Sequence, residues 1–333
     1  MGVAMRKQHD ITREQLHRRT ARYAGPTAAL RDRVVLDHMI DTRIGSGASS
    51  LADGASSAQS LLPLTLKNTA RRRRAPHGSL HKTSATSEPD LFWALRGGGG
   101  NLGVATSFEF RLHPIGPEVY AGLVVYHFAR ARQVLSVWAV LRKAPPLPFL
   151  PAWTHGTEVV VLPLVFCGSV DAGRRAAAPV LKFGDPIAST LGPTPYAGFQ
   201  TAFDPLLAPG GRNYWKSTSF STLSGTALEL VIGAAARLPV PECEIFIAQL
   251  GGAMARVDAS ATAFVGRDAH FIMNVHGRWS DAGDDQRVRA WARQAFEEVA
   301  PHATGSGYVN FLTEDEGERV SASYGANYPG CRW

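Results

Sequence analysis

From residue 84 onward, hydrophobic and polar positions follow the two periods that regular secondary structure imposes. Alternation with a period of two, or a short apolar run, indicates a strand, and a period near 3.6 indicates an amphipathic helix. The first pattern predicts strands over residues 104–112, 121–128, 158–169, 242–257, 269–280 and 308–312. The second pattern predicts helices over residues 129–144, 171–184, 284–303 and 314–325.

The order of these elements predicts the fold class. Strands and helices mix along the chain, and no internal repeat is present. We therefore expect an α+β fold, with a largely antiparallel sheet and helices on one face. The helix over 284–303 should place Trp291 and Phe296 on its apolar side. Residues 1–83 lack a sustained period, although Thr12 and Gln15 have the spacing of a capping box for a short opening helix.

A glycine run separates a short helix from a strand near residue 100. Ser87 is placed to cap the helix, Pro89 falls in its first turn, and Gly97–Gly100 end it. The strand over 104–112 follows. This order, helix then glycine loop then strand, is the reverse of the order that places a pyrophosphate on a helix N-terminus, so a Rossmann or P-loop site is excluded.

The length of 333 residues suits about two domains. Charge is distributed unevenly along them. The whole chain carries a formal charge of +7, whereas residues 1–85 alone carry +9 and residues 86–333 carry −2. A basic chain suggests a polyanion partner. Because the patterned part is slightly acidic and the run Arg71–Arg74 has no interleaved aromatic residue, we expect neither nucleic acid nor a membrane as a partner.

Three cysteines, Cys167, Cys243 and Cys331, have neither the number nor the spacing of a disulfide framework or a zinc site. Cys167 and Cys243 lie in apolar runs and are interpreted as buried thiols. The N-terminus lacks the apolar core of a signal peptide, and charged residues and prolines interrupt the most apolar stretch. A cytoplasmic protein is expected.

Several segments in order resemble one family. The string SATSEPDLFWALRGGGGNLGVATSFEFRLHPIGP, residues 84–117, resembles the end of the FAD-binding domain of berberine-bridge-enzyme-like flavoproteins, which have a PCMH-type FAD-binding domain and belong to the vanillyl-alcohol oxidase superfamily. The branch similar to 6-hydroxynicotine oxidases is nearest. The similarity continues through GPTPYAGFQTAFD, NYWKS, LGGAMARV, HGRWSD read as a turn, and YVNFLTEDEGERVSASYGANY, and so covers residues 84–328.

This resemblance implies FAD as the cofactor and the glycine run as one of the segments that bind it. Consecutive glycines let the backbone approach a ligand closely and direct N–H groups at phosphate oxygens. A plain flexible connection is the competing interpretation of an isolated glycine run, and the matching flanks disfavour it. By resemblance, FAD contacts would come from Gly98, Gly99, Gly100, Asn101, Gly103, Val104 and Thr106.

The resemblance also implies which side chains meet the flavin ring and the substrate. On the strand predicted over 308–312, Tyr308 and Asn310 would share one face and line a pocket. Lys216, beside Trp215, is a candidate for orienting an anionic group, with an ordinary surface lysine as the alternative. His276 is interpreted as structural, because a histidine in a turn usually is.

The two ends of the chain depart from the family pattern. Residues 1–83 contain no RGGGHN-like segment, no GGGxGW-like loop and no attachment Cys, although residues 76–90 resemble a distorted hairpin. After residue 328 the chain stops short of the family's last segment. We therefore expect both ends to be truncated or out of frame. The expected divisions are a basic, poorly ordered leader (1–83), a remnant of the FAD-binding domain (84–118), a substrate domain (119–305) and a truncated C-terminal element (306–333).

Together these observations predict an FAD-dependent oxidoreductase with FAD held non-covalently. It would move a hydride to flavin N5 from a C–H bond next to a hydroxyl or amine of a small molecule, with oxygen or another acceptor reoxidising the flavin. Two alternatives stay open. One is a non-catalytic remnant that no longer binds FAD, and the other, more remote, is a basic nucleic-acid-binding module.

Overall fold

The computed structural model describes residues 70–74, 80–98, 104–105, 117–135, 152–154, 159–183, 185–200, 210–251 and 254–331. Its largest feature is an antiparallel sheet with the strand order β7-β4-β6-β5-β10-β11-β9, and β8 pairs with β4 beside β7. The strands are β4 (Glu118–His127), β5 (Ala152–Thr154), β6 (Val159–Phe166), β7 (Ala188–Ser189), β8 (Gly192–Pro195), β9 (Arg212–Phe220), β10 (Glu244–Gln249) and β11 (Phe271–Trp279).

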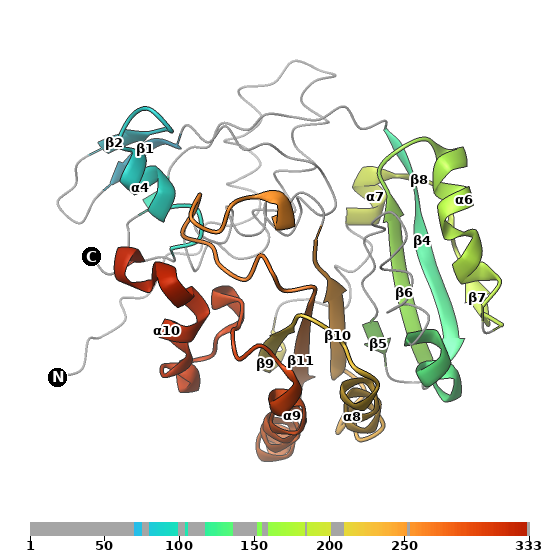
Figure 1. Cartoon of the computed structure of the whole chain (residues 1–333). Helices are drawn as coiled ribbons and strands as arrows, with labels where there is room; N and C mark the ends of the chain where they lie inside the picture. Colours follow the sequence, from blue (N-terminus) through green and yellow to red (C-terminus); the bar gives the residue numbers. More distant parts are fainter. Residues whose placement is uncertain are drawn as a thin grey trace.

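Long helices cover one face of this sheet, as the sequence predicts. Helix α6 (Val170–Leu181) lies along β4, while α8 (Gly225–Ala235) and α9 (Asp285–Val299) lie side by side against β10, β11 and β9 (Figure 1). Serine hydroxyls at Ser169 and Ser224 accept hydrogen bonds from N–H groups in the first turns of α6 and α8 and so fix where they begin.

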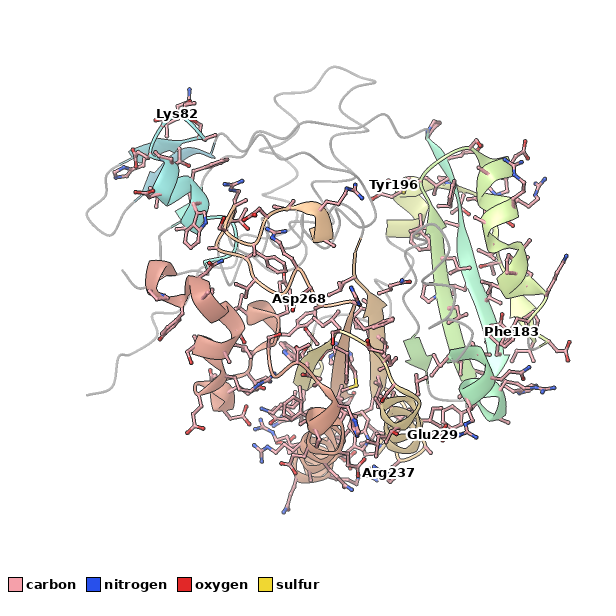
Figure 2. The ribbon with its side chains drawn as sticks, viewed as in Figure 1. Lys82, Phe183, Tyr196, Glu229, Arg237 and Asp268 are labelled. Atoms are coloured by element: carbon pink, nitrogen blue, oxygen red, sulfur yellow. The ribbon has the colours of Figure 1, made fainter. Side chains whose placement is uncertain are left out.

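The main core lies between the sheet and this helix layer. Its largest fully buried side chains include Trp279, Phe220 and Ile245. Trp291 of α9 is buried there as expected, and its indole N–H donates to the Ala234 carbonyl of α8 over 3.0 Å. On the outer side of the layer, Arg237, labelled in Figure 2, pairs with Glu298 at 2.6 Å. Apolar contacts therefore join the two helices on the inside, and on the outside an ion pair joins α9 to the residue that follows the C-cap of α8.

The opposite face carries a shorter helix at one end. Helix α7 (Tyr196–Gln200) packs through Tyr196, labelled in Figure 2, on Val119 and Ala121 of β4. Along β4, Val119 and Ala121 alternate with Tyr120 and Val124, and the latter two face the main core. The expectation of helices on one face therefore holds for the long helices, and α7 is an addition on the other face.

A second, three-stranded sheet precedes the main one, with the order β2-β1-β3. It consists of β1 (Ala70–Arg74), β2 (Leu80–Thr83) and β3 (Val104–Ala105), with the short helix α4 (Pro89–Ala94) between β2 and β3 (Figure 1). Strands β1 and β2 pair as an antiparallel hairpin, but β1 lies before residues 76–90, over which a distorted hairpin was expected. The stretch 1–83, expected as a poorly ordered leader, thus contributes two strands to the same sheet as β3, while the helix expected near Thr12 lies outside the described residues.

The start of α4 and the end of β10 differ from expectation. Ser87 does not cap α4: its hydroxyl donates to the Lys82 carbonyl, and Glu88, at φ 49°, is the N-cap. The strand expected over 242–257 ends at Gln249, and 254–256 form the single 3₁₀ turn η4 (Met254–Arg256). The segment HGRWSD, expected as a turn, continues β11 up to Trp279.

The strand expected over 308–312 is also wrong. Tyr308 precedes a 3₁₀ turn, η7 (Val309–Phe311), in which the Phe311 N–H donates to the Tyr308 carbonyl. The residues just before this segment contact β9 through its Ser219: the Thr304 N–H donates to the Ser219 carbonyl, and the Ser219 N–H donates to the Ser306 carbonyl. The chain then continues through η8 (Glu314–Glu316), α10 (Arg319–Tyr324) and η9 (Gly325–Cys331).

Candidate functional site on the sheet face opposite α8 and α9

Strands β9, β11 and β10 present two different faces because their side chains alternate. One set of positions, including Phe220, Val275 and Ile247, joins the core beneath α8 and α9. The other set faces away from these helices and is largely polar. It consists of Asn213, Trp215, Ser217, Ser219, Glu244, Phe246, Ala248, Ile272, Asn274, His276 and Arg278, and we call it the open face.

A histidine and a glutamate pair on the open face. His276 of β11 lies directly opposite Glu244 of β10 in the ladder, and a hydrogen bond of 3.2 Å joins Nδ1 to the Glu244 Oε1 atom. A second hydrogen bond, also 3.2 Å, joins His276 Nε2 to Asn213 Oδ1. The Asn213 amide is itself fixed, because its Nδ2 donates to the Gly211 carbonyl and its Oδ1 accepts from Arg278. The half-buried imidazole is therefore held from both sides.

Two further polar atoms on the open face have no partner in the described chain. The indole Nε1 of Trp215 and the Oδ1 of Asn274 are both shielded from solvent, and neither makes a hydrogen bond there. Trp215 lies opposite His276, with ring centroids 5.9 Å apart, and Asn274 is two residues away on β11. A shielded donor or acceptor without a partner costs about 1–3 kcal/mol.

Lys216, one of the predicted site residues, points to the opposite face. Its ammonium is 2.9 Å from Asp315 and 3.4 Å from Glu316, and it donates to the Thr313 hydroxyl over 3.1 Å. The Lys216 and Glu316 residues are each 5% exposed. Lys216 therefore ties the segment after η7 to β9, within a network that Arg319 extends by pairing with Glu316.

The electrostatics of this network favour the charged carboxylates. Burial alone would raise the pKa of the Asp315 carboxyl, but hydrogen bonds from Thr313, Tyr214 and Lys216 outweigh it and hold the pKa well below its usual range. The pKa of Glu316 is lowered in the same way, by Thr313 and Arg319 against the effect of burial. The ion network is thus compensated within the chain.

Tyr308 and Asn310, predicted to share one strand face, instead belong to the η7 turn. The Tyr308 ring packs edge-on against Phe311, with centroids 5.1 Å apart, and against Phe264 at 6.4 Å. Asn310 lies inside the turn, and its side chain is outside the described structure. The structure does not place Lys216 on the open face with Trp215, although the two are adjacent in sequence.

The glycine run begins in a tightly packed position. Gly97 has φ +118°, and a Cβ there would lie 2.3 Å from the Phe264 backbone nitrogen, so no other residue fits. The Gly98 N–H donates to the Ala94 carbonyl over 2.8 Å, and Val104 lies in β3. Of the other predicted FAD contacts, Gly99, Gly100, Asn101, Gly103 and Thr106 lie outside the described residues.

Sequence reasoning did not single out Glu244, Asn274 or Trp215 as site residues. The usable signal was alternation: in ECEIFI and FIMNVHGRW every second residue is apolar, and the residues between them include Glu244, Asn274 and His276. What the sequence lacked was the register that pairs residues 32 positions apart, such as Glu244 and His276.

The fold is that of berberine-bridge-enzyme-like FAD-linked oxidoreductases, so the resemblance deduced from the sequence is confirmed. Berberine-bridge-enzyme-like 1 of Physcomitrella patens superimposes with a TM-score of 0.70 over 80% of this chain and 60% of its own, at 17% identity. The corresponding values for 6-hydroxy-D-nicotine oxidase from Arthrobacter nicotinovorans are 0.68, 80%, 61% and 16%. No protein-family model matches the chain.

Curated relatives agree with this class. An FAD-linked oxidoreductase of Dictyostelium discoideum is 26% identical in an alignment of 253 residues that covers 74% of this chain and 55% of the relative. The FAD-linked oxidoreductase aurO of Gibberella zeae is 26% identical in an alignment of 255 residues that covers 73% of this chain and 50% of the relative. The chain thus spans about half the length of the curated relatives it matches. In the described part of the chain, no helix combines the length and apolarity needed to cross a bilayer.

Proposed function

We propose that this chain is an FAD-dependent oxidoreductase acting on a small molecule, with FAD held non-covalently and oxygen or another acceptor taking the electrons. The observation that carries the proposal is the open face: a Glu–His pair beside two shielded, unpartnered polar atoms, in a chain similar to FAD-linked oxidoreductases. When bound, FAD supplies the acceptor for a hydride taken from a C–H bond next to a hydroxyl or amine.

The residues present suit a flat, polar cofactor with its substrate. Glu244 and His276 hydrogen-bond to each other on the open face, so an uncharged ring can lie against them without leaving either side chain without a partner. We assign the FAD contacts, as the resemblance implies, to the glycine run and the residues after it. They are Gly98, Gly99, Gly100, Asn101, Gly103, Val104 and Thr106.

Within this proposal, Glu244 is the group that accepts the proton released when the substrate is oxidised. Its carboxylate is a quarter exposed and hydrogen-bonded to an imidazole that Asn213 holds in place, which is the arrangement of an oriented general base. Tyr308 and Asn310 remain proposed catalytic side chains that would reach the substrate from η7. Lys216 would act as a positioning residue, because its ammonium holds the segment that follows η7.

The visible spectrum of the purified full chain tests the proposal directly. A yellow protein, or one that becomes yellow on reconstitution with FAD, supports it. A colourless protein that cannot be reconstituted overturns it and supports a non-catalytic remnant.

The role of Glu244 has its own test in the reconstituted protein. Glu244→Gln should slow anaerobic bleaching of the flavin by a panel of small alcohols and amines at least 100-fold, since general-base catalysis contributes about 10²–10⁴-fold. Flavin content should not change. Glu242→Gln, at an exposed position two residues earlier, is the matched control and should bleach at the normal rate. Equal rates in both variants would refute the assignment.

A further inference from the structure

One guanidinium joins the segment around η7 to the main sheet and its helix layer. Arg319 is the first residue of α10, and its side chain is largely buried. Its Nη2 donates to the Ser217 carbonyl of β9 over 3.1 Å, and its guanidinium carbon lies 4.7 Å from the centre of the Phe296 ring of α9. Arg319 is therefore anchored to one strand and one helix at the same time.

Both ends of the segment that carries Tyr308 meet at this guanidinium. On the entry side, Gly307 is buried against it, and a Cβ at Gly307 would lie 3.1 Å from Arg319 Nη2. On the exit side, Arg319 pairs with Glu316. The Glu316 Oε2 in turn accepts hydrogen bonds from the Thr313 N–H over 3.0 Å and from the Thr313 hydroxyl over 2.8 Å. One side chain thus contacts the start of the segment directly and holds its end through Glu316.

Arginine suits this set of contacts better than lysine. A guanidinium is planar and directs five N–H donors in a fixed fork, so it can pair with a carboxylate, donate to a carbonyl and stack on a ring together. An ammonium is a compact charge without a plane. A lysine at position 319 could keep the pair with Glu316, but it could not also reproduce the contacts with Ser217 and Phe296.

We propose that Arg319 is a positioning residue, which fixes η7 against β9 and so sets where the Tyr308 side chain lies. The Tyr308 ring packs on Phe264 with centroids 6.4 Å apart, and the Phe264 backbone lies against Gly97 at the start of the glycine run. A shift of η7 would therefore move Tyr308 relative to the segment assigned to FAD. The catalytic consequence rests on the proposed function, whereas the placement of Tyr308 by Arg319 does not.

Fluorine NMR of the full chain, labelled with 3-fluorotyrosine, reports the surroundings of Tyr308 without FAD or turnover. The resonance that is missing from Tyr308→Phe belongs to Tyr308. In Arg319→Ala it should move toward its position in the urea-unfolded chain. The segment should stay attached, because Ser306 still bonds to Ser219 and Val309 still packs on the core next to α10. An unmoved Tyr308 resonance in the folded variant would overturn the proposal.

Arg287→Ala is the matched control. Arg287 pairs with the residue three positions before it, Asp284, just as Arg319 pairs with Glu316, but it is exposed on α9. Its variant should keep the wild-type Tyr308 resonance. If Arg319→Ala does not fold, Arg319→Lys decides: it keeps the charge and loses the fork, so the Tyr308 resonance should still move. A wild-type resonance in that variant would then count against the proposal.

The reconstituted protein gives a second readout. Arg319→Ala should slow anaerobic bleaching of the flavin about 100-fold, because displacing a reacting group by about 1 Å can cost that much. The probe is the alcohol or amine of the panel that bleaches the wild type fastest. Flavin content should not change, since Arg319 does not contact the glycine run in the described chain. A loss of flavin in proportion to the loss of rate would indicate a structural role only and would contradict the proposal.

The outcomes separate this inference from the proposed function. If the protein cannot be reconstituted with FAD, and the Tyr308 resonance moves in Arg319→Ala but not in Arg287→Ala, the proposed function fails and Arg319 still places Tyr308. If Arg319→Ala binds FAD, is bleached at the wild-type rate and keeps the Tyr308 resonance, the positioning role fails and the oxidoreductase stands.

Discussion

The same three strands carry polar groups on both faces, and the two faces treat them in opposite ways. Beneath the helix layer, the Lys216 ammonium is matched by Asp315 and Glu316 within 3.4 Å. On the open face, the shielded polar atoms of Trp215 and Asn274 are left without partners in the described chain. The ion network on the helix side of the sheet therefore contributes to stability, whereas the two shielded polar atoms on the open face cost stability.

The largest effect on stability should come from removing one member of the ion network formed by Lys216, Asp315 and Glu316. Lys216→Met leaves the buried Glu316 and the partly exposed Asp315 without the ammonium, and breaking a buried pair on one side costs about 3–5 kcal/mol. Urea unfolding measures the loss. Lys182→Met, at an exposed lysine that ends α6, should change stability by less than about 0.5 kcal/mol. A Lys216 effect as small as that of Lys182 would mean that the network is dispensable.

The next effect concerns the contact that ties the glycine run to the segment before β11. Gly97→Ala should destabilise by more than about 2 kcal/mol, because its φ of +118° strains a Cβ that would also collide with Phe264. Thermal and urea denaturation report it. Gly225→Ala, at an open position where α8 begins, is the control and should be neutral or stabilising by about 0.5–1 kcal/mol. Equal behaviour of the two variants would show that the Gly97 packing does not hold in solution.

The contribution of this Lys216–Asp315–Glu316 network to stability should also depend on pH. The folded pKa of Asp315 is lowered, so its contribution is present above the unfolded value of about 3.9 and is lost as the pH falls through the folded pKa. Asp315→Asn should therefore cost about 1 kcal/mol near pH 7, a modest value because this carboxylate is partly exposed, and the cost should shrink below pH 4. Denaturation curves from pH 3 to 7 measure it. A difference that grows as the pH falls would contradict the sign.

The smallest effect on stability is expected on the open face. Asn274→Leu removes an unpartnered shielded oxygen, so the free energy of unfolding should change by less than about 1 kcal/mol and in the stabilising direction. Strong destabilisation here would show that Asn274 has a structural partner, and the contrast between the two faces would disappear.

Much of the fold could be predicted because local pattern and tertiary environment agree. Strand β11 and helix α9 follow the predicted periods closely, with Val275 and Trp291 in the core. The strand predicted over 308–312 was wrong for a reason that lies outside that segment. Its β propensity is high, but Thr304 and Ser306 make the backbone hydrogen bonds to Ser219 of β9, and Tyr308 then precedes a 3₁₀ turn.

The site was harder to predict than the fold, because its geometry depends on register. The string NYWKS pointed to Lys216, but sequence alone cannot say which face a lysine takes when its neighbour Trp215 is equally able to lie on either side. The pairing of Glu244 with His276 arises only when β10 and β11 are aligned. Hydrogen-bond partners that are missing, as at Asn274, have no signature in sequence at all.

Strict alternation in these strands has an evolutionary consequence. Residues of β9, β10 and β11 that form the core never appear on the open face, so a substitution at Trp215, Phe246 or Asn274 changes what the surface recognises without altering a core side chain. Ligand preference can therefore diversify by single replacements while the scaffold is inherited unchanged, and new specificities need not pass through unstable intermediates.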